Sequence, residues 1–293
     1  MRVFVTGASG FIGSAIVENL LAAGHQIVAL ARSDASEKLL KSLGVEVLRG
    51  SLDDLDTLKD GAAGSDGVIH CAFIHDFTDY ANSVKKDQLA IQTLGAALEG
   101  TNRPLIVTSG LVGISNNRPI MEQDQANLEK FPRGLAEEIT ISFSSKGVRS
   151  SLIRLPPSVH GKGDHGVVPG LIAIARKKGV SVYIGDGLNR WPSVHRIDAA
   201  QLYRLALEKG TAGARYHGVA DEGIVFRDIA ELIGKRLNVP VVSKPIEEAV
   251  DHFGWFGRLI LLDSQTSSKH TQEEFGWKPT QTSLLADIEE NYF

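Results

Sequence analysis

Short apolar runs alternate with longer amphipathic stretches over the first half of the chain. The apolar runs lie at residues 2–5, 27–31, 45–48, 67–71, 104–108 and 151–155. Between them, stretches such as residues 15–21 and 88–98 repeat apolar positions at helical spacing. Continuous apolar runs separated by helices are typical of parallel strands that are buried on both faces. The pattern therefore predicts an α/β fold with a parallel sheet.

The second half of the chain predicts a smaller unit of mixed helices and strands. Helical spacing is found in residues 168–175 and 226–237, and short strand-like runs lie at 181–184, 216–219 and 239–242. Turn residues separate these elements. We expect them to pack as a second α/β layer beside the first.

A glycine-rich loop follows the first strand directly. Residues 6–13 read Thr-Gly-Ala-Ser-Gly-Phe-Ile-Gly, and an apolar helical stretch comes next. Glycines at this spacing allow a tight turn, close approach of a pyrophosphate to the backbone, and close packing of helix on strand. The first N–H groups and the dipole of the helix favour phosphate binding. The loop predicts a dinucleotide site that contains Gly7, Ser9, Gly10, Phe11, Ile12 and Gly13.

The end of the second strand indicates which dinucleotide is preferred. An enzyme that prefers NAD usually has an acidic residue here, which accepts a hydrogen bond from the ribose 2′-hydroxyl. This strand ends instead in Arg32 and Ser33. A guanidinium and a hydroxyl suit a 2′-phosphate, so we expect NADP as the cofactor. Asp34 follows at once, which keeps NAD as an alternative.

Composition and charge exclude several classes of partner. Hydrophobic residues make up 43% of the chain and charged residues 23%, and the net charge is −4 without long blocks of one sign. These values argue against binding to nucleic acid or to an anionic membrane. The single cysteine, Cys71, can form no internal disulfide, and no apolar run approaches the roughly 18–20 residues of a membrane span. The histidines show no metal-binding spacing. We expect a cytoplasmic protein without a metal, as a monomer or homodimer.

Several segments together resemble the extended short-chain dehydrogenase/reductase family, which includes sugar epimerases, dehydratases and carbonyl reductases. The glycine loop has the form T-G-x-x-G-F-I-G, residues 156–164 read P-P-S-V-H-G-K-G-D, and residues 275–280 read F-G-W-K-P-T. The resemblance implies a Rossmann-like, doubly wound parallel sheet with a smaller C-terminal α/β substrate domain. It implies an NAD(P)-binding domain at residues 1–160, to which residues 195–210 return. Residues 161–293 would form most of the substrate domain, interleaved with the first.

The resemblance also implies further contacts with the cofactor. In this family an apolar residue after the third strand lies beside the adenine. The segment after the fourth strand passes the ribose, and a proline-rich loop walls the nicotinamide. The matching residues in this sequence are Leu52, Ala72, Phe73, Pro156, Ser158 and Val159.

The family's catalytic residues have an altered counterpart here. The family uses Tyr-x-x-x-Lys, in which the tyrosine transfers the proton and the lysine holds the ribose, together with a serine or threonine that polarises the carbonyl. No tyrosine occurs between Ser109 and Arg149. Arg133 stands in the lysine position and Glu129 in the tyrosine position. The resemblance implies that Ser109, or Thr108 beside it, polarises the carbonyl, and that Arg133 holds ribose or carbonyl oxygens.

Histidines are the remaining candidates for proton transfer, because an imidazole titrates near neutral pH. His160 takes the place of a tyrosine in the loop that walls the nicotinamide, and His75 lies just beyond the fourth strand, at the edge where ligands bind. Residues 191–200 resemble the family's F-V-H-V-x-D-x-A, in which the histidine often has a structural role. We expect substrate contacts from His75, His160, Trp191 and His195, with His160 as the first candidate for proton donor.

These features predict an NADP-dependent oxidoreductase that reduces a small aldehyde or ketone. The cofactor brings the hydride, so the protein has to orient the carbonyl and supply a proton. Two alternatives stay open: an epimerase, dehydratase or isomerase that uses the cofactor transiently, and a non-catalytic NADP-binding sensor of the NmrA-like kind. A full substrate domain with histidines near the expected cleft favours an enzyme whose partner is a small carbonyl compound.

Overall fold

Seven parallel strands form the central sheet of the larger unit. Their order is β10-β6-β5-β4-β1-β2-β3, and every neighbouring pair is parallel. The strands are β1 (Arg2–Thr6), β2 (Gln26–Ala31), β3 (Glu46–Arg49), β4 (Gly67–His70), β5 (Pro104–Gly110), β6 (Arg149–Leu155) and β10 (Arg215–His217). The predicted doubly wound sheet is confirmed, and its strand order reverses at β1. The computed structural model describes residues 1–76, 78–114, 118–129 and 131–293.

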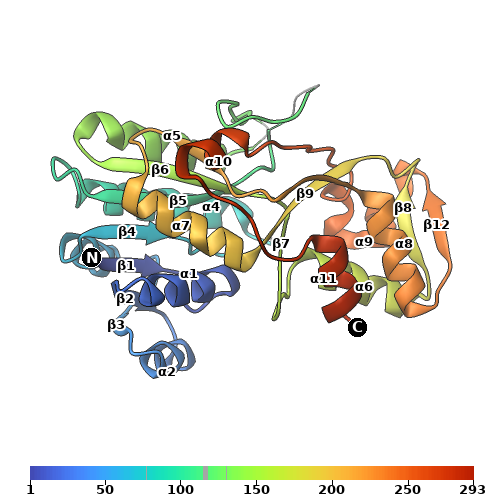
Figure 1. Ribbon diagram of the computed structural model, residues 1–293, viewed down its shortest axis with the longest axis horizontal. Coiled ribbons are helices and arrows are strands. Elements are labelled where there is room, and N and C mark those ends of the chain that lie inside the picture. Colours follow the sequence, from blue (N-terminus) through green and yellow to red (C-terminus); the bar gives the residue numbers. More distant parts are fainter. Residues whose placement is uncertain (77, 115–117, 130) are drawn as a thin grey trace.

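Helices cover both faces of this sheet (Figure 1). One face carries α1 (Phe11–Ala22) and α7 (Arg196–Lys209), and the other carries α3 (Leu55–Ala63), α4 (Tyr80–Ala96) and α5 (Gly134–Ser142). The helix α2 (Asp34–Ser42) follows β2, and the short 3-10 helix η1 (Phe143–Lys146) extends α5. Alternate side chains of β1 enter the two cores, Val3 and Val5 on one face and Phe4 on the other.

The smaller unit is built around two small sheets, of order β11-β9-β7 and β12-β8. Their strands are β7 (Ser158–His160), β8 (Ser181–Ile184), β9 (Arg190–His195), β11 (Asp221–Val225) and β12 (Val241–Lys244). The helices are α6 (Val167–Lys178), α8 (Phe226–Leu237), η2 (Ile246–Glu248), α9 (Ala249–Phe253), η3 (Gly254–Arg258), α10 (Lys269–Phe275) and α11 (Leu284–Asn291). Most of these lie beyond the carboxyl ends of the central strands, on the right of Figure 1, whereas α10 lies over the larger unit.

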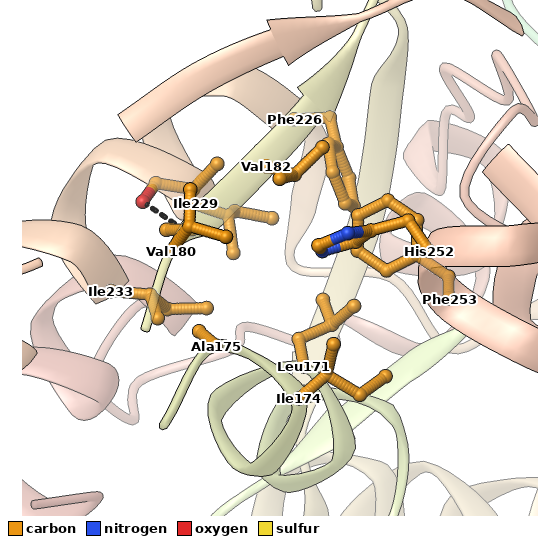
Figure 2. Close-up of a pocket in the computed structure, with 12 residues that line it drawn as sticks. Leu171, Ile174, Ala175, Val180, Val182, Phe226, Ile229, Ile233, His252 and Phe253 are labelled. Carbon is orange, nitrogen blue, oxygen red and sulfur yellow. Dashed lines mark hydrogen bonds between the residues drawn. The ribbon is translucent and has the colours of Figure 1, made fainter. Parts of the chain in front are cut away.

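An apolar core holds the smaller unit together. Figure 2 shows Leu171 of α6, Val182 of β8, and Phe226 and Phe253 around a common centre. The void at this centre has a volume of about 10 Å³, room for about one water, so it is a gap in the packing and too small for a ligand. His252 borders this void, and burial lowers the pKa of its imidazole to about 4, so the ring is neutral at pH 7.

The chain returns to the larger unit over a longer stretch than expected. The expected return, residues 195–210, corresponds to α7. In the structure β10 also joins the central sheet beside β6, so Tyr216 lies in this sheet and not in the smaller unit. The Phe275 ring of α10 packs against Tyr216 with centroids 4.6 Å apart. Trp277 is buried on the same side, where its indole N–H donates to the Asp198 carbonyl at 3.1 Å.

A buried ion pair joins α5 to β6. The Arg154 guanidinium is fully buried and donates to Glu137 Oε2 at 2.6 Å and to Oε1 at 3.0 Å. Arg154 also donates to the Glu122 carbonyl at 3.1 Å. Glu137 is buried as well, at 3% exposure. Because both charges have left water, the pair stabilises the fold only while each keeps its partner.

Removal of one partner of this pair should cost far more stability than removal of an exposed pair. We expect Glu137→Ala to lower the free energy of unfolding by about 3–5 kcal/mol, because the Arg154 charge then stays buried without its carboxylate. Lys146→Ala removes an ion pair with Glu99 whose side chains are 51% and 43% exposed, and should cost less than about 1 kcal/mol. Chemical denaturation measures both variants. Equal losses would contradict the assigned role of the buried pair.

Candidate functional site

The carboxyl ends of β1, β2 and β4 open onto a cleft of about 660 Å³. This is the switch point of the sheet, where ligands of doubly wound folds bind. The cleft is lined by Gly7, Ser9, Gly10, Phe11, Ile12, Gly13, Leu30, Arg32, Ser36, Gly50, Ser51, Leu52, Asp53, Cys71, Ala72, Phe73, Ile74, His75, Asp76 and His165. All six loop residues expected at a dinucleotide site are therefore in one wall.

The glycine loop holds its backbone against two neighbours. Gly7 has a φ of +74°, and a Cβ added there would lie 2.7 Å from the Ala72 amide nitrogen. A Cβ on Gly13 would lie 2.0 Å from the Gly7 carbonyl oxygen. Any other residue at either position would displace the backbone. The loop thus sets the first turn of α1 directly at the cleft, with its N–H groups available for an anion.

The end of β2 differs in one detail from the expectation. Arg32 lines the cleft as expected, but Ser33 does not. The Ser33 hydroxyl caps α2: it accepts from the Ser36 amide at 3.2 Å and donates to the Ser36 hydroxyl at 3.0 Å. Ser36, one helical turn later, lines the cleft in its place.

The nearest acid at this strand end is engaged elsewhere. Asp34 Oδ1 forms an ion pair with Arg49 Nη2 at 2.8 Å, on the outer edge of the sheet. Leu52 lines the cleft as expected, and Asp53 beside it pairs with Lys86 at 2.8 Å. The wall next to Arg32 therefore combines the apolar Leu52 with Asp53, whose negative charge is partly balanced by Lys86.

The segment after β4 forms the opposite wall. Ala72, Phe73 and His75 line the cleft as expected. The Arg133 guanidinium carbon lies 3.9 Å from the centroid of the Phe73 ring. This cation–π contact holds the Arg133 side chain against Phe73. Burial, and secondarily the positive charge of Arg133, lower the pKa of the His75 imidazole below its ordinary value. Tyr80 of α4 lies against the same Phe73 ring, with centroids 6.1 Å apart.

A buried hydrogen-bond chain supports this wall from behind. Thr6 Oγ1 lies 2.7 Å from His70 Nδ1, and His70 Nε2 lies 3.1 Å from Asp87 Oδ1. A neutral His70 with its proton on Nε2 satisfies both contacts, because Thr6 then donates and Asp87 accepts. The other carboxylate oxygen of Asp87 lies 4.0 Å from Arg133 Nε. The Ala72 amide donates to Thr6 Oγ1 at 3.4 Å. The hydrogen-bond chain therefore starts at Ala72 in the wall and ends at Asp87, beside Arg133.

Ser109 does not present its proton to the cleft. Its hydroxyl donates to Glu137 Oε1 at 2.6 Å and is 9% exposed. Thr108 Oγ1 lies 2.7 Å from the Tyr203 hydroxyl, so the alternative residue is engaged as well. Neither residue lines the cleft. The expected polarisation of a carbonyl by Ser109 would require this hydrogen bond to Glu137 to break.

The expected nicotinamide wall differs most from the structure. Pro156, Ser158 and Val159 do not line the cleft, and Ser158 and Val159 belong to β7, which pairs with β9. His160 is 1% exposed, and its Nδ1 lies 2.7 Å from Asp287 Oδ2. A strand that joins the small sheet turns this imidazole into the smaller unit, which explains the difference from the expectation.

The two further substrate candidates also have structural positions. Trp191 is fully buried, packs on Phe226 with ring centroids 5.1 Å apart, and donates to the Leu262 carbonyl. It is therefore a core residue of the smaller unit. His195 accepts from the Ile197 amide at 3.3 Å and so caps α7. It borders a second cleft, of about 580 Å³, beside α6 and α11.

Some cleft residues were not expected from the sequence. His165 comes from the smaller unit, and Ser36 from the first turn of α2. Helical spacing from the Ser33 cap could have indicated Ser36, but no local signal marks His165. Cys71 also lines the cleft, and burial raises the pKa of its thiol to about 12, which fits a structural thiol and not a nucleophile.

The part of the chain that the structure describes contains no cluster of three or more histidine, cysteine or acidic side chains placed to bind a metal ion. Among the same residues, no helix combines the length and the apolar character needed to cross a membrane.

Substitution of the middle glycine should separate nucleotide binding from folding. A Cβ on Gly10 would meet only the Gly7 carbonyl oxygen, at 3.2 Å, so we expect Gly10→Val to fold. Its branched side chain would occupy the space of a pyrophosphate, and calorimetry should detect no binding of dinucleotides. Gly13→Val, which places its Cβ 2.0 Å from the backbone, should lose stability as well. Unchanged affinity in Gly10→Val would show that the phosphates bind elsewhere.

Comparison with known proteins agrees with this geometry. A family model described as NAD(P)H-binding matches residues 7–138. An uncharacterized protein of Schizosaccharomyces pombe is 52% identical over 98% of this chain and 98% of its own length. An uncharacterized protein of Saccharomyces cerevisiae is 46% identical over 100% of this chain and 99% of its own length.

More distant relatives have named activities. The 4-hydroxy-2-methyl-3-oxo-4-farnesyl-3,4-dihydroquinoline-1-oxide ketoreductase of Stigmatella aurantiaca is 28% identical over 87% of this chain and 80% of its own length. The fold matches that of a dTDP-glucose 4,6-dehydratase of Streptomyces venezuelae, solved with NAD and TYD bound. That match has a TM-score of 0.80 and 19% identity over 100% of this chain and 96% of the other. The sheet, the glycine loop and these relatives together show that the chain belongs to the extended short-chain dehydrogenase/reductase family, whose members bind NAD(P).

Proposed function

We propose that the protein is an NADP-dependent oxidoreductase that reduces a small aldehyde or ketone. The observation that carries this proposal is the presence of His75 in the same cleft as the glycine loop, with Arg133 held against Phe73 beside it. One cleft then has a place for a dinucleotide and, within it, a group that can transfer a proton. The named ketoreductase among the relatives supports the same class of reaction.

The preference for NADP follows from the end of β2. Arg32 and Ser36 both line the cleft, and Ser36 lies in the first turn of α2, where a helix dipole favours an anion. Asp34, the acid that would suit a ribose 2′-hydroxyl, is paired with Arg49. A 2′-phosphate at this position would therefore meet a cation and a hydroxyl, while the Asp53 carboxylate of the same cleft is paired with Lys86.

The proton is assigned to His75. When bound, the nicotinamide supplies a hydride to the carbonyl carbon, and the carbonyl oxygen then needs a proton. Arg133 can stabilise the developing negative charge by charge-assisted hydrogen bonds, but it cannot release a proton near neutral pH. His160, the first candidate from the sequence, is buried against Asp287 and is not among the residues that line the cleft. His75 lines the cleft and is the more accessible imidazole.

A panel of small aldehydes and ketones with NADPH tests the reaction class. A reductase consumes NADPH as product appears, whereas an epimerase, dehydratase or isomerase forms product while bulk cofactor stays constant. A sensor binds the nucleotide and converts no substrate. Absorbance of the reduced cofactor and chromatography of the products separate these cases.

Charge reversal at Arg32 should change the cofactor preference. We expect wild-type protein to bind NADPH more tightly than NADH, and Arg32→Asp to weaken NADPH binding by about 1.5–3 kcal/mol, the range for a hydrogen bond to a charged group. NADH affinity should change little. Lys38→Asp is the matched control, because it makes the same charge change on an exposed residue of α2 outside the cleft. Calorimetry that shows equal wild-type affinity for the two nucleotides would refute the assignment.

Replacement of His75 should remove the pH dependence of turnover. Reduction needs the protonated imidazole, and the pKa of His75 is lowered, so we expect turnover to fall as pH rises through a value below about 6.5. Oxidation of the alcohol needs the neutral imidazole and should rise over the same interval. His75→Ala should lower turnover about 10²-fold or more and flatten both profiles, with NADPH affinity retained. His270→Ala, on an exposed face of α10, serves as the control. Full activity of His75→Ala would remove His75 from the mechanism.

A further inference from the structure

A loop of the smaller unit reaches the glycine loop of the larger one. His165 of this loop lines the cofactor cleft. Its ring meets Phe11 edge-on, with centroids 5.8 Å apart. Phe11 is the first residue of α1, where the helix N–H groups face the cleft. Arg196 of α7 contacts the same residue: its guanidinium lies 5.2 Å from the Phe11 ring and donates to the Phe11 carbonyl at 3.4 Å.

The loop that carries His165 is anchored at several points. Asp164 Oδ1 accepts from the Gly166 amide at 2.7 Å, and Asp164 Oδ2 accepts from the Tyr292 hydroxyl at 2.7 Å. The Tyr292 hydroxyl in turn accepts from the Gly161 amide at 3.3 Å. A residue near the C-terminus thus fixes both sides of the turn. These hydrogen bonds fix the position of His165 at the cleft.

The tautomer of His165 follows from its own contact. Its Nδ1 lies 3.2 Å from the Gly163 carbonyl oxygen, which can only accept, so Nδ1 carries a proton. The other ring nitrogen, Nε2, is then an acceptor in the neutral ring and a donor in the imidazolium. The charged and titratable groups around the ring are Asp164 on its own loop, His75 in the same cleft and Arg196 at the Phe11 ring.

We infer that His165 is a phosphate ligand supplied by the smaller unit, and that dinucleotide binding at the first turn of α1 takes up a proton on its imidazole. A pyrophosphate at the N–H groups of Phe11 and Ile12 would lie beside His165. While Nδ1–H stays on the Gly163 carbonyl, only the imidazolium can also donate Nε2–H to the phosphate. The inference rests on the proposed binding of NADP in this cleft. It adds that the smaller unit binds the cofactor as well as the substrate.

Calorimetry of NADPH binding in buffers of different ionisation enthalpy tests this inference, because the slope of the observed enthalpy gives the protons taken up. The titrations are made about one unit above the ordinary imidazole pKa of about 6.5. We expect wild-type protein to take up protons. His165→Ala should bind NADPH about 10-fold or more weakly, the loss of one charge-assisted hydrogen bond, and with less proton uptake. Adenosine 2′-phosphate, which lacks the pyrophosphate, should bind both proteins equally.

One variant tests whether the charge at position 165 strengthens NADPH binding, and a second tests the anchoring of the loop. His165→Lys keeps a cation on the loop, so it should restore much of the NADPH affinity without proton uptake. Tyr292→Phe removes the hydroxyl that anchors Asp164 and should weaken NADPH in the same direction by a smaller factor. His75→Ala and His270→Ala, titrated in parallel, should keep the uptake assigned to His165.

The outcomes distinguish this inference from the proposed function. If the wild-type protein binds NADPH and His165→Ala shows the same affinity and the same proton uptake, the inference is overturned. The proposed function would still stand. Loss of the uptake in His75→Ala alone would also overturn it, because the proton would then belong to the opposite wall. A wild-type protein that binds neither NADPH nor NADH would overturn both.

Discussion

The close approach of three backbone segments at the cleft is the constraint on which the rest of the structure depends. Gly7 lies against the chain at Ala72, and Gly13 lies against Gly7, at separations that no side chain could enter. This contact brings the first turn of α1 and the end of β4 to one place. The cleft walls, the position of Phe73 and the exposure of the helix N–H groups all follow from it. A dinucleotide site here is a product of missing Cβ atoms as much as of any functional group.

Buried polar pairs hold the helices to this frame. Glu137 of α5 holds Arg154 of β6, and Asp87 of α4 holds His70 of β4. In the smaller unit Asp287 of α11 holds His160 of β7 in the same way. Each pair joins a helix to the sheet it covers, at a point where an apolar contact would allow sliding. Such pairs contribute little net stability, but they penalise a displaced helix strongly, because a shift leaves a buried polar group without its partner in a low-dielectric interior.

The sequence predicted those features that local chemistry determines. The helix at residues 226–237 has the predicted bounds, because its apolar face repeats at helical spacing and a left-handed Asn238 ends it. The glycine loop was recognisable because steric exclusion limits it to one residue type. Arg32 was assigned correctly to the cleft, whereas Ser33 was not, because a helix cap and a ligand contact use the same hydroxyl chemistry.

Residues whose role depends on distant partners could not be predicted in this way. Trp191 and His160 look like ligand residues in the sequence. In the structure both are buried, Trp191 packed on Phe226 and His160 in contact with the Asp287 carboxylate. Nothing near Ser109 in the sequence indicates that its hydroxyl donates to Glu137. His165 reaches the cleft only because Tyr292, near the other end of the chain, anchors its loop. Motif resemblance places such residues near a site, and tertiary hydrogen bonds decide which way they face.

The long return of the chain has a consequence for synthesis on the ribosome. The core over β1 needs α7, and the central sheet needs β10, which ends at His217. The nucleotide-binding unit therefore cannot complete its core until β7, α6, β8 and β9 have already been translated. Domains generally fold in the order in which they emerge. Here the first-made unit has to wait for part of the second, so the nascent chain carries one open face of its central sheet through much of its elongation.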